Sequence, residues 1–380
     1  MIFLIITLAS FSTLFLLRRR QPIGIAILVG GIFIWLCTDP TFKELKDAVI
    51  QMATTPRSYD LVGALYLVIC LEIELRKSGC LAGMVEALSR MFSSRRFTLA
   101  VMPAFLGLLP SIGGARFSAP IVEEASKGFE AKPEDKAAIN FWFRHIFEFS
   151  SPLVPGMILA CGIAGVKIGD LIVHLGWLTI VAFILGWIVM VRGLKQTVAT
   201  RTEVSSEEAK RHNMDFVLSL TPVIANVVLM VAFGLQASVS MIIVVVAMIP
   251  LLMFFNRHVS VKEVFIGALD YKMFANVICI LLFIALLEST GVLALLVAAF
   301  ESSPLPVPVI IGFFSFIIGL ITGISQGHVA IMMLIVAGIS MGAFVLVCVG
   351  MFFFLAGLMV APAPVVVTCT VDFFRCDFFS

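Results

Sequence analysis

Long runs of apolar residues, separated by short charged segments, are the feature that most restricts how this chain can fold. A helix needs about 20 such residues to cross the hydrocarbon of a membrane. Nine segments approach this length: 2–17, 22–38, 59–75, 141–165, 168–191, 214–233, 237–255, 273–290 and 341–371. Two further apolar stretches, 97–127 and 306–338, are interrupted by glycine, proline or polar residues. The pattern predicts an all-α polytopic membrane protein with about nine full spans plus two re-entrant hairpins.

The composition agrees with lipid as the main solvent of the chain. Of the 380 residues, 61% are hydrophobic and only 13% are charged, whereas about a quarter of a soluble domain is charged. The net charge of +2 gives no basic face of the kind that nucleic-acid binding requires. The eight cysteines form no CxxC pair, so we expect neither a zinc site nor a disulfide framework.

The basic residues predict the orientation of the chain. No positive residue precedes the first span, and Arg18, Arg19 and Arg20 follow it. With the N-terminus outside and alternating spans, nearly all basic residues fall on the inner side, as the positive-inside rule requires. We therefore expect a multi-pass protein of the cell (inner) membrane in which the hydrophilic segment 193–213 is a cytoplasmic linker. Ser205 and Glu208 have capping-box spacing, which predicts a short helix within this linker.

The linker separates two halves that resemble each other. A shift of 212 residues (291 − 79) matches glycines and prolines that interrupt helices: Gly79 with Gly291, Gly107 with Gly319, and Pro152 with Pro364. The first copy would start outside and the second inside, so the repeats are inverted, as in many secondary transporters. Chance matching in a sequence rich in Leu, Val and Ala is the alternative.

The repeats define the predicted domains. The first repeat is 1–192, with scaffold spans, a hairpin at 97–127, a broken span at 141–165 and a span at 168–191. The second repeat is 214–380, with scaffold spans, a hairpin at 306–338 and a broken span at 341–371. The counterpart of span 168–191 would begin at residue 380, so we expect the second repeat to lack its last helix.

The tips of both hairpins carry the residues best suited to bind a ligand. They read GLLPSIGGARFSAP over 107–120 and GLITGISQGHVAIM over 319–332. Free backbone N–H groups at a helix start, together with hydroxyl and amide side chains, can hold an anion. Irregular backbone at membrane depth needs protein or water around it, although any single break is alternatively a simple kink. We expect the tips and broken spans to form one substrate site from these residues: Ser111, Gly113, Gly114, Arg116, Ser118, Ser150, Ser151, Thr322, Ser325, Gln326, Gly327 and Thr368.

Two charged or titratable residues at the tips have alternative interpretations. Arg116 either pairs with a substrate carboxylate or extends its side chain towards the cytoplasm. His328 is a proton relay candidate, and a hydrogen-bonded structural histidine is the alternative. Both interpretations stay open for each residue.

The other charged residues of the apolar segments are assigned to surfaces. His145 and Glu148 lie three residues apart, as metal ligands can, but without a third ligand we expect a charge pair and no metal site. Glu72, Glu74 and Glu288 lie near the ends of predicted spans. We expect these carboxylates to be solvated rim residues rather than proton relays.

Three segments carry a resemblance to a known family: GLLPSIGGARFSAPIVEEA, NFWFRHIFEFSSPLVPGMILA and GLITGISQG. Together they are similar to an uncharacterised prokaryotic membrane family, domain of unknown function 401, over nearly the whole chain. That family looks like part of the ion transporter superfamily, which includes gluconate, citrate and dicarboxylate permeases. The resemblance implies a homodimer in which each protomer has a scaffold part and a transport part that moves in an elevator-like way.

These observations predict a secondary active transporter of a small organic anion, driven by proton or sodium and without another cofactor. A sodium/proton antiporter is the first alternative, but no carboxylate is expected deep in a span. A non-transporting integral membrane protein is the second alternative, although only a ligand or ion would justify so many helix breaks. We do not expect an enzyme, because the sequence has no nucleophile–base pair and no metal cluster.

Overall fold

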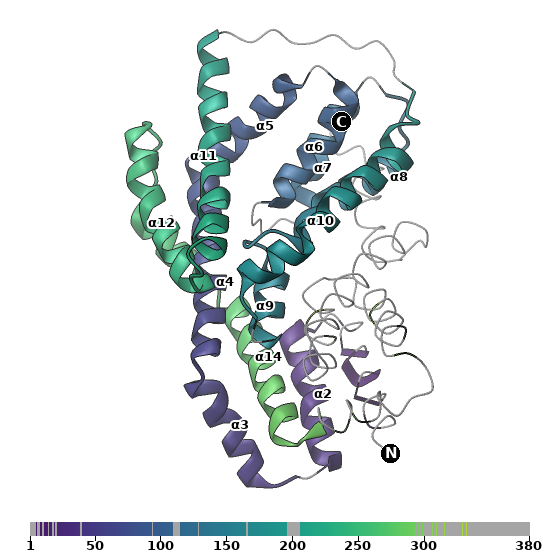
Figure 1. Cartoon of the computed structure of the whole chain (residues 1–380), viewed down its shortest axis with the longest axis vertical. Helices are drawn as coiled ribbons and strands as arrows, with labels where there is room; N and C mark the ends of the chain where they lie inside the picture. Colours follow the sequence, from purple (N-terminus) through teal and green to yellow (C-terminus); the bar gives the residue numbers. More distant parts are fainter. Residues whose placement is uncertain are drawn as a thin grey trace. The chain divides into compact units, whose positions relative to one another are not determined.

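The structure of the chain is a computed structural model. It describes residues 21–108, 115–195 and 206–292, apart from residues 39, 93, 128 and 165, together with isolated positions within 5–19 and 295–332. Every regular element in this part of the chain is a helix (Figure 1). The prediction of an all-α protein is therefore confirmed for the described residues.

Residue contacts divide the chain into two units, of which the first contains α2 (Ile23–Thr38), α3 (Phe42–Thr54) and α14 (Tyr271–Ser289). Helix α14 packs on both α2 and α3. Gly24 and Gly31 permit the close approach, since added Cβ atoms would lie 2.6 Å from the backbone of Asn276 and 2.3 Å from the ring of Phe283. The Gly24 N–H, which has no partner within the first turn of α2, donates a 3.0 Å hydrogen bond to the Asn276 side chain.

The second unit contains most of the remaining helices: α5 (Cys80–Met91), α6 (Arg95–Leu108), α7 (Ala115–Ser126), α8 (Pro133–His145), η1 (Ile146–Phe149), α10 (Ile168–Gly186), η2 (Trp187–Val191), α11 (Ser206–Val231), α12 (Ala237–Phe254) and α13 (Val261–Gly267). Helices α4 (Pro56–Lys77) and α9 (Pro155–Ala164) are divided between the two units. Helix α5 packs along α11, and α6, α7, α8 and α10 pack together (Figure 1). The Trp142 indole joins α8 to α10 by donating a 2.9 Å hydrogen bond to the Ala182 carbonyl.

Four of the described helices are long and apolar enough to cross a membrane: Ile168–Val191, Ser206–Val231, Ala237–Phe254 and Tyr271–Ser289. They coincide with four of the predicted spans. Helices α2 and α6 are apolar but shorter. The structure is thus consistent with the predicted membrane protein, and the total number of spans stays a prediction.

The start of α11 differs from the prediction of a short, separate helix in the linker. Helix α11 begins at Ser206 and continues without a break through the apolar segment to Val231. Glu207 and Glu208 lie in its first turn, where negative side chains interact favourably with the helix dipole. The end of the hydrophilic segment is therefore not a helix boundary, and Asp215 lies well inside the helix.

Two helix ends agree with the predicted internal repeat. Helix α4 ends at Lys77 and α14 ends at Ser289, positions that the 212-residue shift relates (289 − 77). A glycine in the left-handed region follows each helix, with φ of 80° at Gly79 and 66° at Gly291. Glycine adopts this conformation without a steric penalty and commonly ends helices in this way. The agreement supports the repeat, which stays a prediction for the chain as a whole.

Two contacts join helices of different predicted repeats: α4 of the first repeat contacts α13 of the second, and α14 of the second contacts α3 of the first. On α4, the Tyr66 hydroxyl donates to a backbone carbonyl of α13 at 2.7 Å, and Lys77 lies 3.4 Å from Glu263 of α13. On α14, Glu288 accepts a 2.7 Å hydrogen bond from Gln51 of α3. Gln51 and Glu263 are themselves matched positions (263 − 51). Each unit therefore mixes segments of both copies, rather than containing one copy alone.

A Gly83→Ala substitution should destabilise the contact between α5 and α11. The added Cβ would lie 2.1 Å from the Asp215 carboxylate, whose position is fixed by a hydrogen bond from Arg257. Because overpacking is costly, we expect the free energy of unfolding to fall by about 1–3 kcal/mol, measured as a lower unfolding temperature in detergent. Gly176→Ala is the matched control, since nothing lies within 4 Å of its added Cβ. Equal shifts in the two variants would contradict the close packing of α5 on α11.

Candidate functional site

The described residues include only part of the predicted substrate site. The following predicted residues lie outside the described part of the chain: Ser111, Gly113, Gly114, Thr322, Ser325, Gln326, Gly327, Thr368 and the relay candidate His328. The backbone of Arg116 lies in the first turn of α7, and its side chain is outside the described part. Ser118, Ser150 and Ser151 are described, so the site can be built from the first repeat.

The first interrupted stretch contains two separate helices. Helix α6 ends at Leu108, α7 begins at Ala115, and the two helices pack against each other (Figure 1). The predicted interruption of 107–120 is therefore observed, and the re-entrant path through a membrane stays a prediction. Pro120 was expected to contribute to the break, but it lies inside α7. As the sixth residue of α7, Pro120 removes one hydrogen bond from the helix, which nevertheless continues to Ser126.

The second interruption separates α8 from α9. Helix α8 ends at His145, a 3₁₀ turn follows over Ile146–Phe149, and α9 begins at Pro155. The Ser151 N–H donates to the Phe147 carbonyl at 2.9 Å, and the Leu153 N–H donates to the Ser151 hydroxyl oxygen at 3.3 Å. These bonds satisfy backbone groups that a continuous helix would have paired, so the break is an ordered turn.

The two breaks contact each other directly. An added Cβ on Gly107, at the end of α6, would lie 1.8 Å from the backbone carbonyl oxygen of Arg144, at the end of α8. Beside it, the Ser151 hydroxyl donates a 3.2 Å hydrogen bond to the Leu108 carbonyl. Only glycine allows this approach at position 107. The helix end at Gly107 and the break at Ser151 therefore meet in one place, and the hairpin and the substrate site of the first repeat stay predictions.

The other two described serines fix the helices around this contact. The Ser118 hydroxyl of α7 donates to the Asn140 side chain of α8 at 2.6 Å, and both residues are fully buried. The Ser150 hydroxyl shares a 2.7 Å hydrogen bond with the Thr179 hydroxyl of α10. Each serine thus ties a helix to its neighbour at the break, which is a positioning role beside any ligand contact.

A group of buried charges lies at the same place. Arg144, at the C-terminus of α8, is 7% exposed and is attracted by the carboxylates of Glu148 and Glu72. Glu72 of α4 is 4% exposed and lies 3.9 Å from Arg76 on the next turn. Glu148 has a side chain that is 9% exposed and lies 3.9 Å from His145. We call Arg144, Glu72 and Glu148 the buried charge group.

This burial corrects two predictions. Glu72 and Glu74 were expected to be solvated rim residues, but their exposed fractions are 4% and 0%. Glu288 is exposed, as a rim residue should be. Helix packing rather than distance from the end of a predicted span thus decides the burial of these two carboxylates, and the expectation that no carboxylate lies deep in a span stays a prediction.

Sequence reasoning missed Arg144 and Asn140, although a signal was present. Asn140, Arg144 and Glu148 recur every four residues within the apolar segment NFWFRHIFEF. This spacing places polar side chains along one face of a helix. Such a polar stripe inside a predicted span indicates side chains that face the protein interior. Taken as a single basic residue, Arg144 had been counted on the cytoplasmic side.

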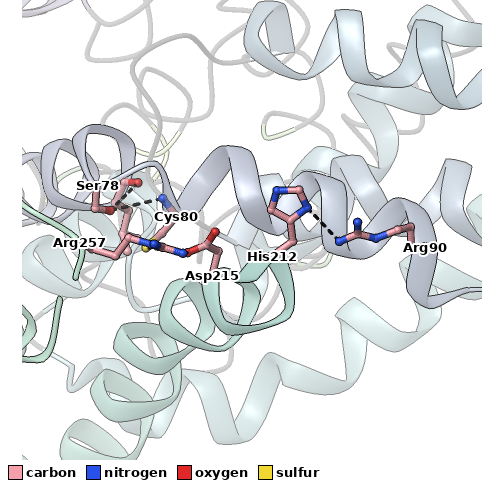
Figure 2. A network of polar contacts seen from close by, with 7 residues as sticks. Ser78, Cys80, Arg90, His212, Asp215 and Arg257 are labelled. Carbon is pink, nitrogen blue, oxygen red and sulfur yellow. Dashed lines mark hydrogen bonds and ion pairs between the residues drawn. The ribbon is translucent and has the colours of Figure 1, made fainter. Parts of the chain in front are cut away.

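A second polar network joins α5, α11 and the segment after α12 (Figure 2). Arg257 donates to the Asp215 carboxylate through Nε at 2.7 Å and approaches it through Nη2 at 2.6 Å. Burial raises the pKa of the Cys80 thiol, so the thiol stays protonated and donates to Asp215 at 3.8 Å. Since the carboxylate and the guanidinium are paired within the protein, we assign this network to structure rather than to ligand binding.

The comparisons with known proteins identify the family. The family model "Protein of unknown function (DUF401)" matches residues 3–380. The chain belongs to this family. No curated protein matches the chain. The resemblance to the DUF401 family is therefore confirmed, and the link to the ion transporter superfamily stays a prediction. Within the described part of this DUF401 protein, no three His, Cys, Asp or Glu side chains are arranged as metal ligands.

An Arg144→Gln substitution should strongly destabilise the protein. Removal of the guanidinium leaves the buried carboxylate of Glu148 without the positive charge that attracts it, and an uncompensated buried charge costs about 3–5 kcal/mol. The measurement is the unfolding temperature in detergent. Adding Glu148→Gln should recover part of the loss, because the double variant no longer buries the uncompensated charge.

The control for this prediction is Arg192→Gln, which removes an exposed arginine. It should leave the unfolding temperature nearly unchanged. If Arg144→Gln and Arg192→Gln lowered it equally, Arg144 would not be part of a buried charge group.

Proposed function

We propose that this protein is a secondary active transporter of a small organic anion, coupled to proton or sodium. The observation that carries the proposal is the contact of two helix breaks, at Gly107 and Ser151, beside the buried cation Arg144. Interrupted helices that meet within the protein are typical of the substrate sites of secondary transporters. The inverted repeats, the second hairpin, the homodimer and the location in the cell membrane belong to the same proposal.

Arg144 supplies the preference for an anion. A guanidinium can bind a carboxylate through two parallel hydrogen bonds, which gives strong and directional recognition. Its position in the last turn of α8, where the helix dipole favours a cation, keeps it charged. The carboxylates of Glu72 and Glu148 compensate its charge when no substrate is bound, so a substrate carboxylate competes with them for the same cation.

A sodium/proton antiporter is the second candidate, and one observation favours it. The buried carboxylates of Glu72 and Glu148 lie beside the break, and antiporters of this kind need carboxylates within the membrane. The two candidates differ in the solute that crosses the membrane. The organic-anion transporter moves an organic anion, whereas the antiporter moves only cations.

Transport assays distinguish the candidates. The purified protein in proteoliposomes should take up at least one of labelled gluconate, citrate or lactate when a proton or sodium gradient is imposed. Cation-for-proton exchange without anion uptake would favour the antiporter and contradict the main proposal.

Arg144→Lys should weaken substrate binding in the same assay. Lysine keeps the positive charge, and so the fold, but cannot form the paired hydrogen bonds of a guanidinium. The loss of a charge-assisted hydrogen bond, about 1.5–3 kcal/mol, predicts a KM for uptake that is roughly ten to a hundred times higher. Arg192→Lys, at an exposed position, is the control and should keep the wild-type KM. An unchanged KM in Arg144→Lys would remove Arg144 from the binding site.

A further inference from the structure

Helix α4 carries a second buried carboxylate that the proposed substrate site does not use. Glu74 is 0% exposed, and neither of its carboxylate oxygens has a hydrogen-bond partner in the described part of the chain. It follows Glu72 by two residues, which corresponds to about 200° around a helix. Glu74 therefore lies on the side of α4 opposite to the side that carries Glu72.

Two cations at the end of α4 and two buried arginines of the same unit interact with other carboxylates. On α4, Arg76 lies 3.9 Å from Glu72, and Lys77 lies 3.4 Å from Glu263 of α13. On α8, Arg144 is attracted by Glu148 and Glu72. Arg257 is bound to Asp215 on α11. Two described residues at helical spacing before Glu74 carry a thiol and a phenol: Cys70, one turn before it, and Tyr66, which donates to α13.

These surroundings decide the ionisation state of Glu74 in this conformation. An ionised carboxylate that is buried without a counter-charge or hydrogen-bond donors is far less stable than the neutral acid, which the group reaches by taking up a proton. The neutral carboxyl still carries an O–H bond that can release its proton when water reaches it. Glu74 is thus a single-proton store within the protein.

The same surroundings are unsuited to sodium. In transporters of this type, sodium is held by several oxygen atoms, many of them carbonyls of unwound helix. Glu74 lies inside the continuous helix α4, and its own carbonyl accepts a hydrogen bond from the Ser78 N–H at 3.0 Å. Among the described residues, no hydrogen-bonding group is bound to either oxygen of its carboxylate.

We propose that Glu74 carries the proton that is coupled to anion transport. The inference rests on the proposed transport function and names its coupling ion. In the conformation described here the carboxylate oxygen holds the proton; in a conformation that admits water to this side of α4, the O–H bond breaks and the proton leaves to solvent. Because Glu72 of the buried charge group lies on the same helix, α4 connects the substrate site with the proton site.

The test uses the full-length protein in proteoliposomes with labelled gluconate, citrate and lactate. For each coupled proton, a pH difference of one unit drives about tenfold accumulation. Wild-type protein should reach this accumulation with at least one of the three anions, and sodium gradients should have no effect. Glu74→Gln, which mimics the neutral acid, should reduce accumulation to about onefold while anion exchange at equal pH continues. Glu74→Asp, which keeps a carboxyl group, should retain part of the accumulation.

The control is Glu263→Gln, which removes a carboxylate whose side chain is 58% exposed and should leave accumulation unchanged. Infrared spectra provide a readout that needs no substrate: the wild type should show the carbonyl band of a protonated carboxyl group at neutral pH, and Glu74→Gln should lack it. The inference alone would be overturned if the wild type and Glu74→Gln both exchanged anions and reached the same pH-driven accumulation. It would also be overturned if the infrared spectra of the two proteins did not differ in the carboxyl band. Absence of exchange with all three anions would overturn the proposed function and the inference with it.

Discussion

The interior of this protein depends on the contact between two interrupted helices, at the ends of α6 and α8. A helix that ends within an apolar region leaves backbone N–H and C=O groups without partners, and each such group must be satisfied by protein. Here the end of α6 contacts the break that follows α8. The missing side chain of Gly107 admits the Arg144 carbonyl, and the Ser151 hydroxyl donates to the Leu108 carbonyl. A carbonyl at the end of α6 is thus satisfied by the break after α8.

The same contact explains why charged residues lie inside. Arg144 ends α8, where the dipole of the helix favours a cation, and Glu134 and Asp135 occupy the opposite end of that helix. Glu148 follows Arg144 by one turn, on the 3₁₀ turn that continues α8, and its carboxylate attracts the guanidinium. An apolar pair of similar volume would often be as stable as a buried ion pair. The buried charges of Arg144 and Glu148 are therefore better explained by a function than by a contribution to stability.

Sequence patterns predicted the parts of the fold that depend on local preference. The apolar segments of α10, α12 and α14 have nearly the bounds expected, and Gly79 and Gly291 end helices in the left-handed conformation that glycine favours. The break at Ser151 was also predictable, since Pro152 and Pro155 follow it closely. Burial was not predictable in this way. Glu72 and Glu74 were placed at a surface by their distance from the end of a segment, whereas both are buried in the folded chain. Likewise, Pro120 lies inside α7, which continues past it.

Helix α4 connects these observations. It carries carboxylates on two sides, and their charges are neutralised by different means. Glu72 interacts with Arg76 and Arg144. Glu74 has no hydrogen-bond partner among the described residues. Several ion pairs can hold a helix in one position. A carboxyl group that is neutralised only by a proton can lose that proton when water enters. Its other contacts, from Tyr66 and Lys77 to α13, come from the second predicted repeat. In the proposed transporter, α4 thus contacts a helix of the second predicted repeat and carries on one side a carboxyl group whose charge depends on a proton.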